Sequence, residues 1–365
     1  MKGIFARHEG VSLHFFTALI SIFMVLCSIL IGGCSFCGNK EQRLSDTLTV
    51  LNWEDYIEMG VVRSFEKEFG VKVIIRTFAS EDEMISMVLS DPGKYDLAVT
   101  SESIVKTITD MGLIAPIDKK NIPNISGIDP DISNTPGDPL MQFSVPYLWG
   151  TSGIAVNRRY VTADVIDWGI LFDRRYANRI DMLNDIQENF APALKMIGCS
   201  INARDKQDLT RAQNILKKQR LIIRGYFDSQ EIQEHLLDGS TYIAFLYSGD
   251  SLMVAQENPD IEYVVPPSGA PIWLDSWVIP ATSKNKNTAE AFINYILKPE
   301  NIATISNYVW YANAVSSSNR YLNSELLESR SIYLPAPLLA RCEYYLPLDE
   351  TTNQFFNKLW YELLR

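Results

Sequence analysis

Three short groups of residues combine carboxylates with aromatic rings. Residues 53–56 read Trp-Glu-Asp-Tyr, residues 185–188 read Asp-Ile-Gln-Glu, and residues 273–277 read Trp-Leu-Asp-Ser-Trp. A spacing of three puts both acids of 185–188 on one face of a helical turn, and the period of two of a strand puts both rings and the acid of 273–277 on one side. Carboxylates beside aromatic faces suit a flexible polycation, because each desolvated ammonium group gains charge-assisted hydrogen bonds and cation–π contacts of ~0.5–2 kcal/mol.

Each group also has an ordinary structural explanation. The rings of 53–56 can anchor a loop whose acids are solvated, and 185–188 can be the solvated face of a surface helix. The same combination of acids and rings suits a sugar-binding groove. The residues alone therefore predict an acidic, aromatic site and leave its ligand open.

The composition is that of a soluble globular protein with an excess of acidic residues. The 365 residues are 47% hydrophobic and 21% charged, and Lys+Arg number 33 against 44 Asp+Glu, a net charge of −11. A broad phosphate-binding surface needs the opposite sign of charge, so we expect no nucleic acid as a partner. At roughly 100–200 residues per domain the length predicts two domains.

The sequence lacks the residues and motifs that several common classes of enzyme need. His235 is the only histidine after residue 33, so a zinc site of two or three histidines is excluded and a catalytic triad would depend on this one residue. P-loop, G-x-G-x-x-G, H-E-x-x-H and G-x-S-x-G motifs are absent. Enzymes of these kinds are therefore disfavoured, and we expect no metal and no cofactor, although a two-carboxylate glycosidase, which needs no histidine, stays open.

Residues 1–45 are predicted to lie outside the fold. Residues 1–33 form a signal peptide of the lipoprotein type, since Ile-Gly-Gly before Cys34 resembles a bacterial lipobox. Cleavage there would put a lipid on Cys34 and leave residues 34–45 as a periplasmic tether. An uncleaved transmembrane anchor is the alternative, because the apolar run approaches the roughly 17–25 residues that span a bilayer. Cys199 and Cys342 either form one disulfide or stay as free thiols.

From Thr47 onward the hydrophobic pattern predicts an α/β fold. An apolar run at 48–53, a helix at 61–69, a β-branched run at 71–78, a helix opened by Ser80 and Glu83, and a strand at 95–99 give the order βαβαβ. This spacing is typical of a parallel sheet whose binding groups lie at the carboxyl ends of its strands. Farther on, strands are predicted at 143–146, 153–156, 220–223, 242–247, 262–265 and 272–280, and helices at 185–197, 206–218, 288–297 and 353–364.

Four motifs together resemble a known family. Asn-Trp-Glu-Asp-Tyr at 52–56, Tyr-Asp-Leu at 95–97, Ser-Val-Pro-Tyr-Leu-Trp-Gly at 144–150 and Trp-Leu-Asp-Ser at 273–276 stand in the order and spacing of the spermidine/putrescine-binding periplasmic proteins of polyamine ABC transporters. The similarity covers about residues 48–316. It implies a monomeric, extracytoplasmic binding protein of two lobes, each a sheet flanked by helices, which closes on a polyamine and delivers it to a membrane permease. The resemblance also implies that the protein is not an enzyme.

The resemblance also implies roles for individual residues. Trp53 and Tyr56 match an aromatic wall, Asp55 and the pair at 185 and 188 match carboxylates that receive amines, and Asp275 matches the centre of the site. The implied ligand-binding set is Trp53, Glu54, Asp55, Tyr56, Ser101, Asp185, Glu188, Ser229, Tyr247, Trp273, Asp275 and Tyr311. Departures from the family pattern are Glu54, Ser103 and Tyr247, which replace threonine, tyrosine and tryptophan, and Tyr345 stands nearest to a family glutamine. Which polyamine is preferred therefore stays open.

The two lobes are expected to be built from discontinuous segments. We assign 46–152 with 276–312 to one lobe and 153–275 with 313–365 to the other, so that the chain crosses between them more than once. The predicted function is capture of putrescine or spermidine in an acidic, aromatic cleft between the lobes. A receptor for another small cationic solute and a two-carboxylate glycosidase of the cell envelope are the alternatives.

Overall fold

The computed structural model describes residues 43–133, 136–164 and 166–365. Residues 44–365 form one compact unit. The predicted signal peptide, the lipidated Cys34 and most of the predicted tether lie outside the described residues. Within these described ranges, no helix is both long and apolar enough to cross a membrane.

Three parallel strands open the fold and confirm the predicted βαβαβ order. They are β1 (Thr47–Asn52), β2 (Lys72–Thr77) and β3 (Leu97–Ser101), connected by α2 (Met59–Phe69) and α3 (Glu81–Ser90). Helix α2 ends where Gly70 adopts a left-handed backbone (φ 70°), a conformation that costs glycine little, and its N–H caps the carbonyl of Glu66. Helix α3 begins as predicted, since the Ser80 hydroxyl accepts the N–H of Glu83.

Two long antiparallel strands connect this sheet to the rest of the unit. Strand β10 (Pro271–Pro280) lies between β3 and β5 (Ser144–Asn157). The first half of β5 pairs with β10 and its second half pairs with β8 (Ile243–Tyr247) and β9 (Ile261–Val264). The prediction of two strands around 147–150 is wrong: β5 is continuous, because these residues are buried and pair with β10.

The remaining strands complete one curved sheet. The order along it is β2-β1-β3-β10-β5-β8-β6-β7, and β6 (Ile180–Leu183) runs parallel to both β8 and β7 (Gly225–Phe227). The short strands β4 (Ile114–Ala115) and β12 (Glu343–Tyr344) pair with β10, and β11 (Ala312–Asn313) pairs with β5. The strand predicted at 220–223 is wrong, since Arg220 ends a helix and the next residues turn back on Gln219.

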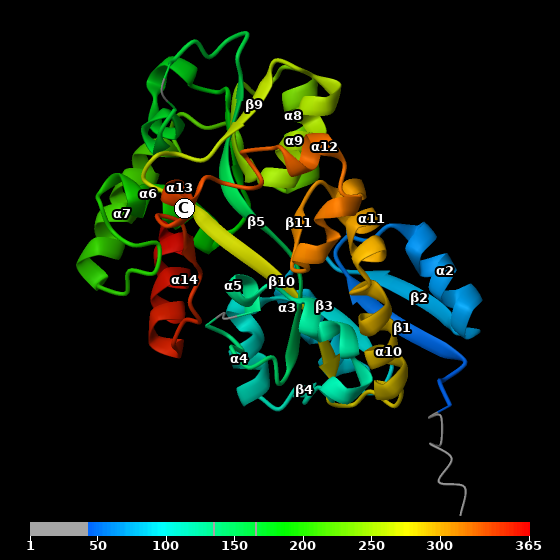
Figure 1. Ribbon diagram of the computed structural model, residues 1–365. Helices are drawn as coiled ribbons and strands as arrows, with labels where there is room; N and C mark the ends of the chain where they lie inside the picture. The colour runs from blue at the N-terminus through cyan, green and yellow to red at the C-terminus, as the bar shows by residue number, and fades with distance from the viewer. Residues whose placement is uncertain (1–42, 134–135, 165) are drawn as a thin grey trace, which may run out of the picture. The chain divides into compact units, whose positions relative to one another are not determined.

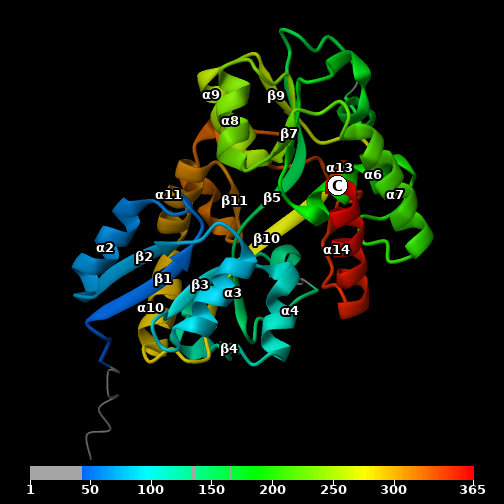
Figure 2. The same ribbon diagram turned by 180° about the vertical axis from the view of Figure 1, so that it is seen from behind.

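Helices cover both faces of each half of the sheet, as Figures 1 and 2 show from opposite sides. In the first half α2, α10 (Lys286–Ile296) and α11 (Pro299–Val309) lie on one face, and α3 and α4 (Glu102–Asp110) lie on the other. The second half carries α6 (Ile186–Met196), α7 (Lys206–Gln219), α8 (Ser229–Leu237), α9 (Ser248–Glu257) and α14 (Glu350–Leu364). The short helices are α5 (Pro130–Ser133), α12 (Ser324–Leu327), α13 (Ala336–Leu339), η1 (Lys119–Asn121), η2 (Pro123–Gly127), η3 (Trp168–Phe172), η4 (Arg174–Tyr176) and η5 (Ser316–Tyr321).

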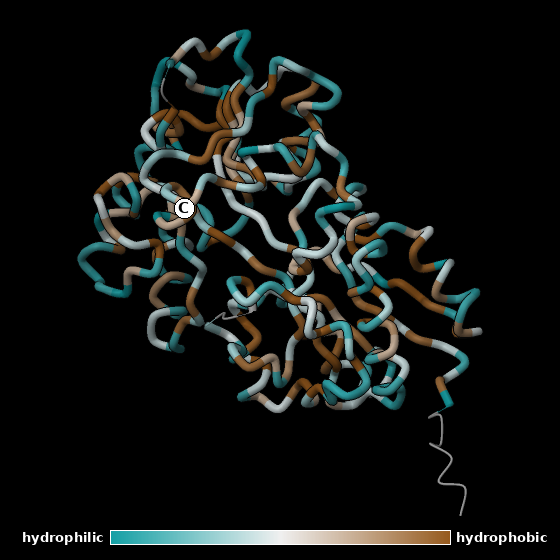
Figure 3. Tube along the Cα trace, viewed as in Figure 1, coloured by the Kyte–Doolittle hydropathy of each residue, from teal (hydrophilic) through white to brown (hydrophobic). Residues whose placement is uncertain are grey.

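The buried apolar residues form separate cores in the two halves. Residues 48–149 and 272–332 supply the cores of the first half, and residues 154–270 with Leu334 and α14 supply those of the second. Figure 3 shows the hydrophobic residues concentrated along the strands. We propose on this basis that the chain passes back from the first lobe to the second near Tyr333, twenty residues after the boundary expected at 313.

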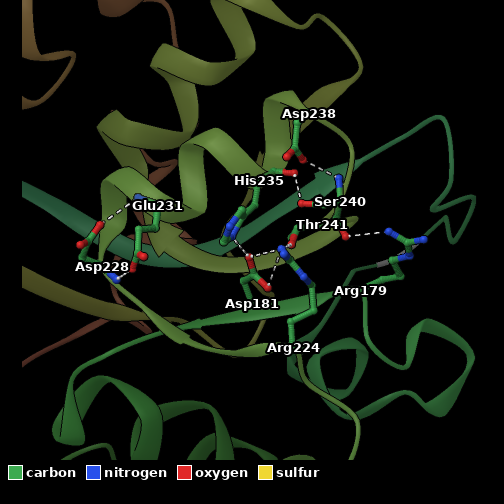
Figure 4. A network of polar contacts seen from close by, with 9 residues as sticks. All are labelled: Arg179, Asp181, Arg224, Asp228, Glu231, His235, Asp238, Ser240 and Thr241. Atoms are coloured by element: carbon green, nitrogen blue, oxygen red, sulfur yellow. Dashed lines mark hydrogen bonds and ion pairs between the residues drawn. The ribbon is translucent and has the colours of Figure 1, made fainter.

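A buried ion-pair network ties β6 to α8 (Figure 4). The carboxylate of Asp181, fully buried on β6, lies 3.1 Å from Nη1 of Arg224 and 2.8 Å from Nδ1 of His235. The same Arg224 nitrogen donates to Thr241 Oγ1 at 2.8 Å. Both elements position residues of the predicted site, because β6 ends just before Asp185 and α8 begins at Ser229. The network therefore stabilises the scaffold behind the site.

Candidate functional site

Asp275 lies on the central strand of the sheet, where β10 is enclosed by both neighbours. In register it pairs with Ser101 on β3 and Leu148 on β5, and it is 8% exposed. Burial raises the pKa of its carboxyl to about 7, while the neighbouring Tyr56 hydroxyl and Trp53 indole lower it in part. Neither donor group completes a hydrogen bond with another described residue, so two buried donors stand beside a buried acid.

Aromatic rings form a continuous wall next to Asp275. The rings of Trp273 and Tyr311 meet edge to face with centroids 4.8 Å apart, and Tyr247 meets Trp273 at 5.9 Å. Tyr56 extends the wall, 5.9 Å from Tyr311. The indole N–H of Trp273 has no hydrogen-bond partner among the described residues. Such a wall offers apolar faces to methylene groups and π-faces to cations.

The predicted acid pair lies at the start of α6. The Asp185 carboxylate caps this helix by accepting the N–H of Glu188 at 2.8 Å. The Glu188 carboxylate, 5% exposed, accepts hydrogen bonds from Ser152 Oγ (2.9 Å) and the Tyr345 hydroxyl (3.0 Å). Burial, with the charge of Asp185 as a second cause, raises the pKa of Glu188 to about 8. Desolvation of the carboxyl also raises the pKa of Asp185, although the residue as a whole is exposed.

A buried asparagine holds the loop that presents this pair. The Asn189 amide, fully buried, donates to the backbone carbonyls of Leu183 (2.5 Å) and Asp185 (2.6 Å). Its two donor hydrogens thus fix the turn from β6 into α6. The position of Asp185 is set by this turn, which neither the composition nor the spacing of the motif predicted.

Asp250 is a site carboxylate that the sequence reasoning missed. It is 9% exposed near the start of α9 and accepts a hydrogen bond from the Tyr311 hydroxyl at 2.6 Å. Burial raises its pKa to about 6, against the lowering effect of Tyr311 and the predicted site residue Ser229. It follows the carboxyl end of β8, as Asp185 follows that of β6, so the expectation that binding groups lie at strand ends could have found it.

The other predicted residues take more peripheral positions. Ser101 caps α4, and its hydroxyl lies 2.8 Å from that of Ser103. A hollow beside these two serines is also bordered by Trp273 and Tyr345, so the small side chain at 103 and the residue nearest the family glutamine both adjoin the site. Glu54 and Asp55 are exposed in the turn after β1, and Asp55 has a left-handed backbone (φ 51°).

Five acids of this site, of which Glu188, Asp250 and Asp275 are buried, have no basic partner within the described ranges. Among the ion pairs of the residues that the structure describes, none includes Glu81, Asp185, Glu188, Asp250 or Asp275. The pKa of Tyr247 is raised well above its usual value by burial and then by the charges of four of these acids. Buried carboxylates are normally paired with a cation or protonated. These carboxylates therefore need either bound protons or a cation from outside the protein to be stable in this site.

Glycine at 249 allows the ring of Tyr311 to approach the backbone closely, which gives a testable prediction. A Cβ added at Gly249 would lie 2.4 Å from the ring, so Gly249→Ala must displace Tyr311 from Asp250. We expect a loss of ~1–3 kcal/mol in the free energy of unfolding, measured by chemical denaturation. The control is Gly127→Ala, whose added Cβ meets nothing nearer than Val315 at 3.6 Å. Equal stability of the two variants would contradict the close approach.

Comparison with known proteins identifies the class to which this fold and site belong. The sequence profile of the bacterial extracellular solute-binding proteins matches residues 60–325. The spermidine/putrescine-binding periplasmic protein of Salmonella typhimurium is 30% identical over 320 residues, which cover 86% of this chain and 92% of that protein. The putrescine-binding periplasmic protein PotF of Escherichia coli is 31% identical over 334 residues, covering 86% and 90%.

A solved structure gives the same result. The substrate-binding protein PotD of a spermidine/putrescine ABC transporter from Streptococcus pneumoniae has a TM-score of 0.79 at 30% identity, over 88% of this chain and 99% of that one. The chain belongs to the bacterial extracellular solute-binding protein family. Its relatives there are polyamine-binding periplasmic proteins of two-lobed fold, so the resemblance and the fold predicted from the four motifs are confirmed.

Proposed function

We propose that this protein captures putrescine or spermidine between its two lobes and delivers it to the permease of an ABC transporter. The observation that carries the proposal is the group of buried carboxylates with no basic partner among the described residues, walled by aromatic rings. A polyamine supplies several ammonium groups at fixed spacing, and its methylene segments match the rings. The names of the relatives support the same ligand class.

The proposal also covers the location, oligomeric state and membrane anchoring of the protein. We propose a periplasmic monomer anchored by a lipid on Cys34, with no catalysis of its own. The relatives are binding proteins rather than enzymes, and they are periplasmic. The predicted lipobox supports the anchor.

The negative cleft is also proposed to attract the ligand before the lobes close. Carboxylates on both lobes repel one another when the site is empty and ionised, so part of the binding free energy comes from relief of this repulsion. Because β5 pairs with β10 in the first half of the sheet and with β8 and β9 in the second, it would form part of a stiff hinge for closure.

Calorimetric titration tests the function. The purified full-length protein is unfolded and refolded to remove carried-over ligand, then titrated with putrescine, spermidine, spermine, cadaverine and lysine at two salt concentrations. We expect micromolar or tighter binding of at least one polyamine, weakened by salt, and no binding of lysine. Heat with lysine alone would favour a receptor for another cationic solute. Turnover of glycans, without heat from any amine, would favour the glycosidase.

The raised pKa values predict how stability depends on pH. In the ligand-free protein the pKa values of Glu188 (about 8), Asp275 (about 7) and Asp250 (about 6) are raised. These acids therefore keep their protons to a higher pH than in the unfolded chain, which releases them near pH 4. A raised acid pKa stabilises the fold at low pH, and this contribution is lost as the pH rises through the folded-state value. We therefore expect the contribution of these acids to lower the melting temperature from pH 5 to pH 8.5.

The control for this prediction removes one titrating group. Glu188→Gln should flatten the decline between pH 5 and pH 8.5, since glutamine carries no charge at either end. Saturating polyamine should flatten it too, because an ammonium group stabilises the ionised carboxylates. A decline that is unchanged in Glu188→Gln would show that other groups cause it.

A further inference from the structure

Glu81 is a carboxylate of the site that no sequence motif singled out. It is the first residue of α3, and its carboxylate bridges to the end of β3. One oxygen accepts the backbone N–H of Ser101 at 2.6 Å and the other accepts the hydroxyl of Thr100 at 2.7 Å. Ser101 pairs directly with Asp275 across the sheet. Glu81 therefore belongs to the wall that faces the central acid.

The electrostatic surroundings of Glu81 include acids from both halves of the sheet. The pKa of Glu81 is raised to about 8, mainly by desolvation and to a smaller extent by the charges of Asp275 and Asp185, against the lowering effect of the hydrogen bonds from Ser101 and Thr100. Asp275 lies on the central strand, whereas Asp185 comes from the start of α6 in the second half of the sheet. No lysine or arginine forms an ion pair with Glu81 in the described part of the chain.

Asp55, which the resemblance assigns to a terminal ammonium group, is placed differently. It is exposed in the turn after β1, and the described residues offer it neither a hydrogen bond nor an ion pair. An exposed carboxylate is already stabilised by water, so pairing with a cation lowers its free energy little. An exposed ion pair contributes only ~0–1 kcal/mol. Glu81 is only partly exposed, and desolvation of its carboxyl group raises its pKa.

The hydroxyl of Tyr56 supplies an independent sign that a ligand binds next to Asp275, the acid that Ser101 pairs with. The residue is 8% exposed and its hydroxyl, beside Asp275, completes no hydrogen bond among the described residues. Unpaired buried hydroxyls are rare in folded proteins, because each one loses its bonds to water. A carboxylate accepts up to about four hydrogen bonds, so Glu81 keeps free positions beside its two neutral donors.

We propose that Glu81, rather than Asp55, is the carboxylate of the first lobe that receives an ammonium group of the bound polyamine. The inference rests on the proposed function, and it adds a ligand-binding residue to that site. The ammonium group would replace the proton that Glu81 holds when the site is empty. Binding would then release a proton from this position.

Matched variants test the assignment by calorimetry with the polyamine that wild type binds most tightly. Glu81→Gln removes the charge and keeps the size, and we expect roughly 10- to 100-fold weaker binding. Asp55→Asn should stay within about threefold of wild type, as is usual for an exposed charge. Thr100→Val removes the hydroxyl that bonds Glu81 but keeps its carboxylate, and should also bind nearly as wild type does.

Proton release separates ligand contact from a structural role. Titration in two buffers of different ionisation enthalpy at pH 7 gives the number of protons released, which should fall in Glu81→Gln and be unchanged in Asp55→Asn. Ligand-free Glu81→Gln should unfold no earlier than wild type at pH 8, because it lacks a desolvated negative charge.

Three outcomes would overturn the assignment. Loss of affinity in Asp55→Asn with wild-type affinity in Glu81→Gln would return the role to Asp55. Equal losses in Glu81→Gln and Thr100→Val, with unchanged proton release, would make Glu81 a purely structural residue. Failure of wild type to bind any polyamine would overturn the proposed function and this inference with it, so the two failures are distinguishable.

Discussion

Replacing Asp275 with asparagine is expected to weaken polyamine binding by ~2–5 kcal/mol, the largest effect of any single change in the site. The variant leaves a desolvated ammonium group without its counter-charge at the most enclosed position, where β10 lies between β3 and β5. The two unpaired donors beside it, on Trp53 and Tyr56, stay in place and cannot substitute for an acceptor. The measurement is the dissociation constant from calorimetric titration.

Glu54→Gln is the matched control for this experiment. It also removes one carboxylate from the predicted set, but Glu54 is exposed in the turn after β1, so affinity should change by less than ~1 kcal/mol. Ligand-free Asp275→Asn should stay folded, because the buried acid already favours its neutral form. Wild-type affinity in Asp275→Asn would rule out Asp275 as the central ligand.

Removing Arg224 is expected to lower the free energy of unfolding by ~3–5 kcal/mol. Arg224→Ala takes the permanent positive charge from Asp181, which is fully buried on β6, and leaves the hydroxyl of Thr241 without its donor. Chemical denaturation of the ligand-free protein measures the loss. The polyamine affinity of the folded variant should change little, since the network lies behind the site.

Two further variants test the cause of this loss. Arg175→Ala breaks an exposed pair with Asp173 and should cost only ~0–1 kcal/mol. The double variant Asp181→Asn with Arg224→Ala should recover part of the lost stability, because it also removes the stranded charge. If the double variant were less stable than Arg224→Ala alone, the uncompensated charge of Asp181 could not be the cause.

Much of the scaffold was predictable from local patterns. The opening βαβαβ unit follows from apolar runs, a capping serine at 80 and a terminating glycine at 70, each of which acts through neighbouring residues. The strand at 271–280 follows from its continuous apolar character. Errors arose where pairing overrode the local pattern: 147–150 became part of β5 because β10 lies beside it, although its Pro-Tyr-Leu-Trp-Gly sequence resembles a loop.

The site was only partly predictable for the same reason. The structure places Tyr56, Tyr247, Trp273, Asp275 and Tyr311 in one group, together with the acid pair of α6. Trp277, expected on the same side as Asp275, packs deeper, against Tyr147 at 4.6 Å. Asp250 and Glu81 carry no motif of their own, because ordinary helix starts often begin with acidic residues.

The sequence by itself determined the class of this protein: an α/β fold, an acidic charge, and aromatic residues beside carboxylates in the order of a polyamine-binding family. The tertiary structure alone decided which carboxylates are buried, and therefore which can pair strongly with a cation. Asp55 and Asp275 are the same side chain, yet one is exposed in a turn and the other is enclosed by two strands. Desolvation depends on all neighbours in space, most of which are distant in the chain, so no local pattern encodes it.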